Sequence, residues 1–289
     1  MDLIEKDILL HSVLLRLSKD EFFINNFVFK GGTCLIKCYL NYFRFSEDVD
    51  FTWKNQGTFS GKSGKQIREE ISLSLKRVMP ALLTISEELG LDFKAEKSNK
   101  TYCEIGGSNK LSTFKLWYRS AVTQGKSFIK IQLNFVEHIC YNFIRHRLTT
   151  LHNAHSDKLS LLFEEYAEYS EEIYFDVYDP REILCEKVRA TLTRKEVKNR
   201  DMIDIYLIHK ELRIEAEDLE NCIRKKLDMA LSLYYKYRKN YEFKLELLKD
   251  RTLFTSSLEE NILLIRIDEN DYYSYVRQFE IFLKNIVKV

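Results

Sequence analysis

The stretch that decides the fold is FVFKGGTCLIKCYL, residues 27–40, followed by DVDFTW at residues 48–53. Residues 27–29 form a short β-type run that ends at a glycine pair, Gly31-Gly32, and residues 33–40 then have helical spacing. The second segment alternates polar and apolar residues, which is typical of a strand. We therefore expect a strand, a glycine pair, a helix and a second strand in this order.

This order of elements suits a phosphate group and a metal ion. A helix that opens directly after two glycines presents backbone N–H groups to an anion, and Thr33 adds a hydroxyl donor there. Asp48 and Asp50 face the same side of their strand because side chains alternate along a strand. Two such carboxylates suit Mg²⁺, or Mn²⁺, and two ions could serve the attacking and leaving oxygens. Each pattern alone is common in turns and on solvated strands, so the prediction depends on their combination, with Arg44 and Ser46 between them.

The rest of the first part mixes helices and strands. A helix is expected over residues 2–17, a flexible loop over 55–64, and a long helix up to about residue 89 that is bent or broken near Pro80. The strands expected from alternation and apolar runs are 91–96, 114–119, 128–136 and 174–178.

The second part is expected to be helical, because no glycine follows Gly125 and tight turns between strands usually need one. Asp179-Pro180 is a good start for a helix. Further helices are predicted over residues 199–212, 215–239 and 268–287. The sequence thus predicts an α+β protein, with an α/β domain at 1–178 and an α-helical bundle at 179–289.

Composition narrows the class of protein. The 289 residues are 45% hydrophobic and 31% charged with a net charge of +1, which describes a globular chain and excludes a generally basic nucleic-acid coat protein. The N-terminus lacks the pattern of a signal peptide and no apolar run is long enough to span a bilayer, so a cytoplasmic location is expected. The six cysteines include no CxxC pair, which predicts neither a disulfide framework nor a zinc site. His152 and His155 are interpreted as solvated loop residues rather than zinc ligands.

The segments FKGGTCL, residues 29–35, and RFSEDVDF, residues 44–51, resemble the first motif of the AbiEii/AbiGii-type nucleotidyltransferases. These are the toxins of bacterial type IV toxin–antitoxin and abortive-infection systems, within the polymerase-β-like nucleotidyltransferase superfamily. The resemblance implies a nucleotidyltransferase domain with a mixed sheet and Mg²⁺-dependent transfer of a nucleoside monophosphate from an NTP to a hydroxyl acceptor. It further implies RNA as acceptor, at a tRNA 3′ end, and a cognate antitoxin as partner. The residues it assigns to the nucleotide are Gly31, Gly32, Thr33, Arg44 and Ser46, and those it assigns to catalysis and the metal are Asp48 and Asp50.

A second block, EILCEKVRATL at 182–192 and RDMIDIY at 200–206, is similar to the C-terminal motifs of the same family. By position, the resemblance implies that Lys187 contacts the triphosphate, that Asp201 acts near the nucleotide or acceptor, and that Asp204 supports it. The helical domain would then contribute to the active-site cleft. From the residues alone, these would be ordinary charges on amphipathic helices.

One position departs from the superfamily pattern. Many polymerase-β-like transferases carry a third carboxylate on a later strand, and the corresponding residue here is Gln132. A neutral amide is a weaker metal ligand and no general base. Two interpretations stay open: this branch works without the third acid, or the chain is a nucleotide- or RNA-binding module without turnover. Glu137 and Glu104 are weak candidates for a replacement.

Basic and aromatic residues alternate over residues 224–226 and 234–241. Such a composition can hold phosphates and stack on unpaired bases, although it also occurs on simple packing surfaces. Any contact with RNA is expected within 181–240, where basic residues exceed acidic ones.

Overall fold

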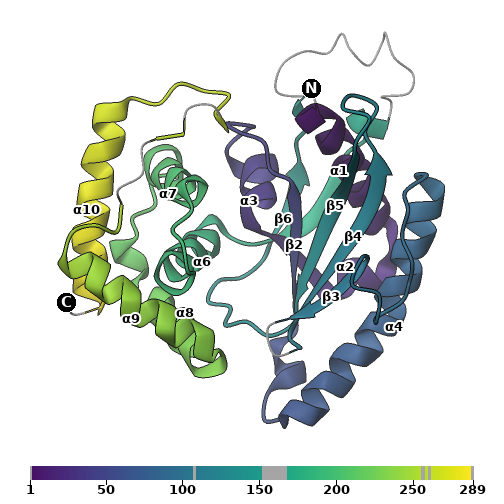
Figure 1. The fold of residues 1–289 in the computed structure, drawn as a ribbon, viewed down its shortest axis with the longest axis horizontal. Helices are drawn as coiled ribbons and strands as arrows, with labels where there is room; N and C mark the ends of the chain where they lie inside the picture. Colours follow the sequence, from purple (N-terminus) through teal and green to yellow (C-terminus); the bar gives the residue numbers. More distant parts are fainter. Residues whose placement is uncertain (1, 107–108, 152–167, 255–257, 260–261, 288–289) are drawn as a thin grey trace. The chain divides into compact units, whose positions relative to one another are not determined.

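The structure is a computed structural model that describes residues 2–106, 109–151, 168–254, 258–259 and 262–287. The chain divides into two compact units (Figure 1). Unit 1 comprises Met1–Glu137 and Phe143–Tyr178, and unit 2 comprises His138–Asn142 and Asp179–Val289. His152 and His155 lie outside the described residues.

Unit 1 is built on a mixed sheet of seven strands in the order β3-β4-β5-β2-β1-β7-β6. The pairs β2–β5 and β1–β7 are parallel and the other neighbours are antiparallel. The strands are β1 (Phe27–Lys30), β2 (Asp48–Trp53), β3 (Cys103–Gly106), β4 (Leu111–Arg119), β5 (Lys126–Asn134), β6 (Ile144–Leu148) and β7 (Ile173–Val177).

Four expected strands are therefore confirmed besides β1, namely β2, β4, β5 and β7, while β3 and β6 were not expected. The expected strand at 91–96 is wrong. This segment forms only an isolated bridge between Asp92 and Trp117, near the end of β4, and residues 93–96 do not continue alongside the strand.

The helices of unit 1 are α1 (Asp2–Lys19), α2 (Glu21–Asn26), α3 (Gly31–Cys34) and α4 (Gly64–Glu88). The expected helix after the glycine pair forms, but its second half, Leu35–Tyr39, is a π-helix (η1). The loop 55–64 contains a short 3₁₀ helix, η2 (Gln56–Phe59). The expected helix is not broken near Pro80, because α4 runs through this proline.

The two faces of the sheet differ in polarity. Along β2, Val49 and Phe51 are fully buried whereas Asp48 and Asp50 are half-buried. Phe51 contacts Phe23 of α2 edge to face at 4.7 Å, so the apolar side chains point to the face that α1, α2 and α4 cover (Figure 1). The alternation of β2 therefore sends its two carboxylates to the opposite face.

A buried polar network holds the segment after the glycine pair against α1. Lys37 is fully buried and its ammonium lies 3.0 Å from the Asp7 carboxylate. Tyr42 and Tyr169 each donate a hydroxyl hydrogen bond to Asp7, at 2.8 and 2.6 Å. Burial and the charge of Asp7 raise the pKa of both phenols, so they stay protonated donors. The network fixes the chain that leads from α3 toward β2.

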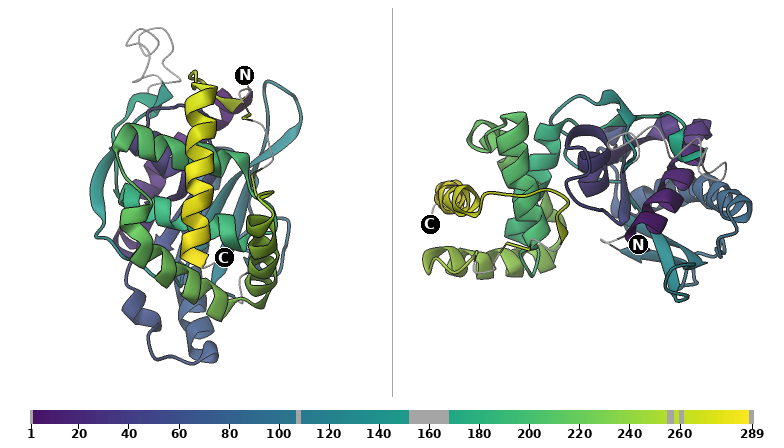
Figure 2. Two further views of the ribbon diagram at one scale, coloured as in Figure 1. Left: turned by 90° about the vertical axis from the view of Figure 1, so that its left-hand side faces the viewer. Right: turned by 90° about the horizontal axis from the view of Figure 1, so that it is seen from above.

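Unit 2 contains helices α6 (Pro180–Thr193), α7 (Asn199–Leu212), α8 (Glu220–Leu233), α9 (Tyr235–Lys249) and α10 (Glu269–Val287), with a short 3₁₀ helix, η4 (Glu217–Leu219). The helix α6 contacts α7, α8 and α9. The helix α10 is one continuous helix (Figure 2). The expected helix 215–239 is instead two helices, α8 and α9, which meet at an extended residue, Tyr234. None of the described helices is long and apolar enough to cross a membrane.

Candidate active site

The two aspartates of β2 form the core of the candidate site. Asp48 and Asp50 lie two residues apart on the polar face of unit 1. In the sheet, Asp50 is opposite Lys30 of β1 on one side and Gln132 of β5 on the other. The predicted carboxylate pair is therefore on the strand, and the face, that the sequence indicated.

The glycine pair allows this face to approach the start of α3 closely. Gly31 has a φ of +81°, and a Cβ built on it would lie 2.5 Å from Oδ2 of Asp50. A Cβ on Gly32 would lie 2.9 Å from Nη2 of Arg44 and 3.4 Å from Oγ of Ser46. A side chain at either glycine would thus collide with a predicted site residue. Because both residues are glycines, the backbone at the start of α3 can lie directly against the Asp50 carboxylate.

Thr33, Arg44 and Ser46 connect the two halves of the motif. The buried Thr33 hydroxyl donates to the backbone carbonyl of Asp48, and Ser46 Oγ lies 2.8 Å from Thr33 Oγ1. Arg44 is also buried, and its guanidinium donates to the carbonyl of Phe45 at 2.8 Å. The bond from Thr33 joins α3 to β2, so Thr33 orients the backbone of Asp48 rather than presenting its hydroxyl outward.

Two residues of β5 lie beside the aspartates. Lys130 is in register with Asp48, and its Nζ lies 2.8 Å from Asp48 Oδ2. Gln132 is in register with Asp50, which is the place expected for the third carboxylate. The Gln132 amide donates to Thr113 Oγ1 of β4 at 3.2 Å. The sequence identified Gln132, but it did not indicate the ion pair between Lys130 and Asp48.

The two weak candidates for a third acid have other partners. Glu137 accepts a hydrogen bond from Asn134 at 3.1 Å, and its carboxylate lies 3.9 Å from the ammonium of Lys30. Glu104 pairs with Lys115. Within the described part of the chain, no third carboxylate groups closely with both Asp48 and Asp50.

The predicted residues of the C-terminal motifs come together within unit 2. Lys187 of α6 places its ammonium 2.9 Å from Asp201 Oδ1 and 2.5 Å from Asp204 Oδ2, both on α7. Arg194 forms a further ion pair with Asp201. All three residues that the resemblance named, Lys187, Asp201 and Asp204, are buried.

The charges of this cluster keep Asp201 ionised. Burial alone would raise the pKa of the Asp201 carboxyl, but the positive charges of Lys187 and Arg194 and the hydrogen bond from Lys187 outweigh it. The pKa of Asp201 therefore lies below its ordinary value. A hydroxyl group of the acceptor that binds the Asp201 carboxylate would have to compete with the side chains of Lys187 and Arg194.

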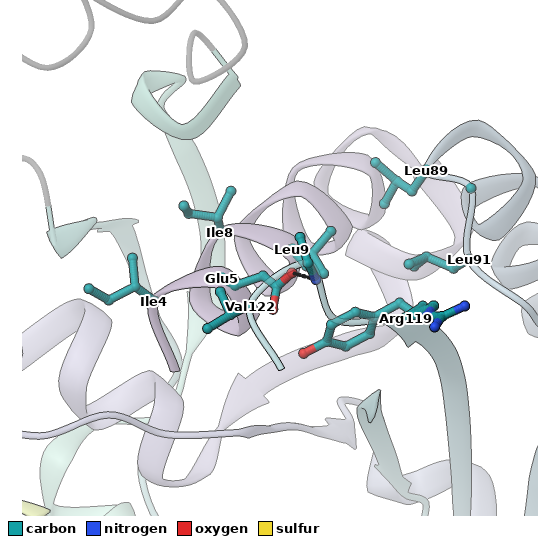
Figure 3. A pocket seen from close by; sticks show the side chains of 11 residues that line it. Ile4, Glu5, Ile8, Leu9, Leu89, Leu91, Arg119 and Val122 are labelled. Atoms are coloured by element: carbon teal, nitrogen blue, oxygen red, sulfur yellow. Dashed lines mark hydrogen bonds between the residues drawn. The ribbon is translucent and has the colours of Figure 1, made fainter. Parts of the chain in front are cut away.

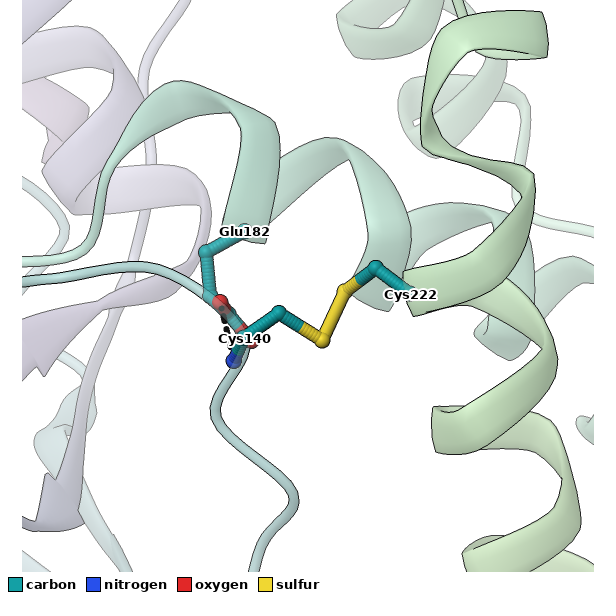
Figure 4. A group of neighbouring side chains, drawn as sticks. All are labelled: Cys140, Glu182 and Cys222. Atoms are coloured by element: carbon teal, nitrogen blue, oxygen red, sulfur yellow. Dashed lines mark hydrogen bonds between the residues drawn. A yellow bond between two sulfur atoms is a disulfide. The ribbon is translucent and has the colours of Figure 1, made fainter.

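A second buried cluster in unit 2 corrects the expectation about cysteines. Cys140 and Cys222 form a disulfide, although their spacing in the sequence gives no sign of it (Figure 4). Beside it, the Glu182 carboxylate accepts backbone hydrogen bonds from Cys140 and Tyr141, both at 2.9 Å. The ammonium of Lys226 lies 2.6 Å from Glu182. The disulfide and this ion pair together attach the loop at residues 138–142 to α6 and α8.

Unit 1 also has a pocket of about 580 Å³ that none of the predicted site residues lines (Figure 3). It is bordered by α1, the end of α4 and the end of β4, with Ile8 and Leu91 among its apolar lining residues. Glu5 at its wall already accepts hydrogen bonds from Ser120 and Ala121. The pocket is thus separate from the carboxylate pair.

Comparisons with known proteins agree with the motif. The family model of the nucleotidyl transferase AbiEii toxin of type IV toxin–antitoxin systems matches residues 12–282. Among solved structures, MenT4, a nucleotidyltransferase toxin from Mycobacterium tuberculosis H37Rv, is 19% identical with a TM-score of 0.50, over 98% of this chain and 84% of that one. JHP933 from Helicobacter pylori is 16% identical with a TM-score of 0.46, over 99% of this chain and 94% of that one. No curated protein sequence matches the chain.

The likeness to MenT4 shows the fold, and the family match extends over nearly the whole chain, including both motif blocks. The chain belongs to the AbiEii family and is a nucleotidyltransferase toxin of a type IV toxin–antitoxin system.

Proposed function

We propose that this enzyme transfers a nucleoside monophosphate from an NTP to a hydroxyl group of RNA. The hydroxyl oxygen forms a bond to the α-phosphorus and releases its proton to water, the bond between the α-phosphorus and the α–β bridging oxygen breaks, and pyrophosphate leaves. The observation that carries the proposal is the approach of the Gly31 backbone to the Asp50 carboxylate, where an added Cβ would lie only 2.5 Å from Oδ2. A phosphate and a carboxylate-bound cation need such a close arrangement.

The donor set fits a divalent cation. Asp48 and Asp50 offer two carboxylates from one strand face, and Mg²⁺ is commonly held by one or two carboxylates together with substrate phosphates. Mg²⁺, or Mn²⁺ in its place, would neutralise charge on the triphosphate as it reacts. The backbone N–H groups of Gly31 and Gly32 would hold phosphate oxygens, and Thr33, Arg44 and Ser46 would keep β2 and α3 in place around them.

We assign further roles to Lys187, Asp201 and Asp204 on the basis of the family motifs. Lys187 would contact the triphosphate, Asp201 would act near the nucleotide or acceptor, and Asp204 would hold Lys187. Their ion pairs, at 2.9 and 2.5 Å from Lys187 Nζ, support a single functional cluster. The low pKa of Asp201 argues for an electrostatic role rather than a role as proton acceptor.

RNA is the proposed acceptor, with a tRNA 3′ end as the specific case. The surface of α9 supports this choice: Tyr235 and Phe243 are 70% and 57% exposed, and the ammonium of Lys239 lies 5.2 Å from the Tyr235 ring centre. These three residues are spaced by four along the helix and share one side of it. Exposed rings next to basic side chains can stack on unpaired bases and hold phosphates. On the basis of the family, the same proposal includes a cognate antitoxin as partner and a role in abortive infection. It also places the protein in the cytoplasm of a bacterial cell.

The test is to incubate the protein with Mg²⁺, total RNA and each of the four NTPs labelled in the α-phosphate. The expected result is label in an RNA band of tRNA size with at least one NTP, together with release of pyrophosphate. Calorimetric binding of NTP without label in any RNA would instead support a binding module without turnover, which Gln132 favours.

A further inference from the structure

The charges next to the carboxylate pair differ from those of a site for two cations. Asp48 and Asp50 of β2 face Lys130 and Gln132 of β5, residue for residue in register. Gln132, at the position expected for a third carboxylate, is thus a neutral amide, and Lys130 on the same strand is a cation. Because two carboxylates are opposed by one ammonium, the net charge of these four side chains is too small to hold two divalent ions.

Lys130 is directed to Asp48 specifically. Its Nζ lies 2.8 Å from Asp48 Oδ2, and both side chains are 26% exposed. Lys115, which is in register with Lys130 on β4, pairs with Glu104 of β3. Among the described residues, Asp48 is the only carboxylate that forms an ion pair with Lys130. Each lysine of this row therefore has its own carboxylate, and that of Lys130 is a predicted metal ligand.

Gln132 cannot provide the missing charge. Its amide nitrogen donates to Thr113 Oγ1 at 3.2 Å, which leaves the carbonyl oxygen as a neutral acceptor next to Asp50. Mg²⁺ favours charged oxygens and completes its shell with water and phosphates. A second ion placed at Asp48 would also meet the ammonium of Lys130 at short range, where like charges repel strongly.

We propose that this site binds a single divalent cation, the one that accompanies the triphosphate. Lys130 is a positioning residue whose ammonium takes the place of a second divalent cation. The proposal rests on the proposed function. The Lys130 ammonium neutralises part of the charge of Asp48 and keeps that carboxylate directed across the β2–β5 pair. The absence of a third acid at Gln132 is then compensated by a cation belonging to the protein itself.

The experiment counts Mn²⁺ ions by electron paramagnetic resonance, first with Mn²⁺ alone and then with a non-hydrolysable NTP analogue. With the analogue, the wild-type protein should bind one Mn²⁺ per chain, with no spin coupling between neighbouring ions. The double variant Lys130→Met with Gln132→Glu should bind a coupled pair. With Mn²⁺ alone, Lys130→Met should bind about tenfold more tightly because the competing ammonium is gone. Lys130→Arg should behave as the wild type.

Lys115→Met is the matched control, since it removes the neighbouring lysine of the same row without touching Asp48. It should leave Mn²⁺ affinity unchanged. A coupled Mn²⁺ pair in the wild-type protein, or equal affinity of Lys130→Met and the wild type, would overturn the proposal while leaving the proposed function intact. Absence of any Mn²⁺ binding by the wild type would instead contradict the metal assignment of the proposed function itself.

Discussion

Gly31 of α3 lies so close to Asp50 of β2 that no methyl group fits between them. A Cβ on Gly31 would lie 2.5 Å from Asp50 Oδ2 and 3.1 Å from its Cβ, and Gly31 has a φ of +81°. The start of α3 and the carboxylate of β2 therefore depend on each other, although Asp50 lies nineteen positions after Gly31 in the sequence. This relationship links the two halves of the motif physically.

Gly31→Ala should abolish nucleotide transfer. The alanine Cβ would collide with Asp50, and the positive φ would cost about 1 kcal/mol in addition. Gly61→Ala is the matched control, because Gly61 also has a positive φ, +68°, but nothing lies within 4 Å of its added Cβ. The two variants are compared by label transfer and thermal melting. Equal activity of both variants would show that the contact with Asp50 is unimportant.

Removal of the disulfide should destabilise the protein. Cys140 and Cys222 close a loop of 82 residues, and loss of such a crosslink typically costs about 2–4 kcal/mol in free energy of unfolding. A reductant should lower the melting temperature of the wild type but not that of the variant with both cysteines replaced by serine. Cys103→Ser, which removes a buried free thiol, should keep the sensitivity to reductant. A wild-type melting temperature that is the same with and without reductant would contradict the disulfide.

The buried pair of Glu182 and Lys226 should be strongly coupled. The side chains are 1% and 0% exposed, and the two charged groups lie 2.6 Å apart. Lys226→Met should lower the free energy of unfolding by about 3–5 kcal/mol because it leaves a buried carboxylate without its cation. The variant with Glu182→Gln as well should recover much of this loss. A double-mutant cycle in urea measures the coupling, and simple addition of the two single effects would argue against it.

His11 should make unit 1 sensitive to acid. Burial, followed by the charge of Lys37, lowers the pKa of His11 from 6.5 to about 4. The unfolded chain therefore binds a proton more readily, and the stabilisation present above pH 6.5 is lost as the pH falls toward 4. The free energy of unfolding should fall by up to about 3 kcal/mol across this range. His11→Phe should flatten that part of the curve, and an unchanged slope would rule out His11 as its source.

The strands that carry the candidate site residues could be predicted from the sequence, because the pattern of a strand is set by neighbours in the chain. The glycine pair, the alternation of Asp48 and Asp50 and the alternation of β5 are all set by neighbours in the chain. Gln132 could be assigned to the polar face of its strand because such residues recur every second position, whereas its register with Asp50 is seen only in the structure. The start of α6 was equally clear, since Asp179 caps it by accepting a hydrogen bond from the Arg181 backbone.

Contacts between distant residues could not be predicted in this way. The pairs Cys140–Cys222, Lys226–Glu182 and Lys130–Asp48 each join separate elements. In the sequence, Lys226, Glu182 and Lys130 look like solvated surface charges. The strand β6, with the sequence IRHRL, was missed because most of its residues are basic. Segment 91–96 was wrongly predicted as a strand because its residue pattern suits one, but it forms only one bridge.

Label transfer by Asp48→Asn and Asp50→Asn variants tests the central claim most directly. Each variant removes one carboxylate charge from β2 while keeping the size of the side chain. With Mg²⁺, total RNA and NTP labelled in the α-phosphate, the wild type should transfer label to RNA. Each folded variant should lose at least about a hundredfold in rate, in line with the loss of an electrostatic contact to the reacting phosphate. Wild-type rates in both variants would contradict the account.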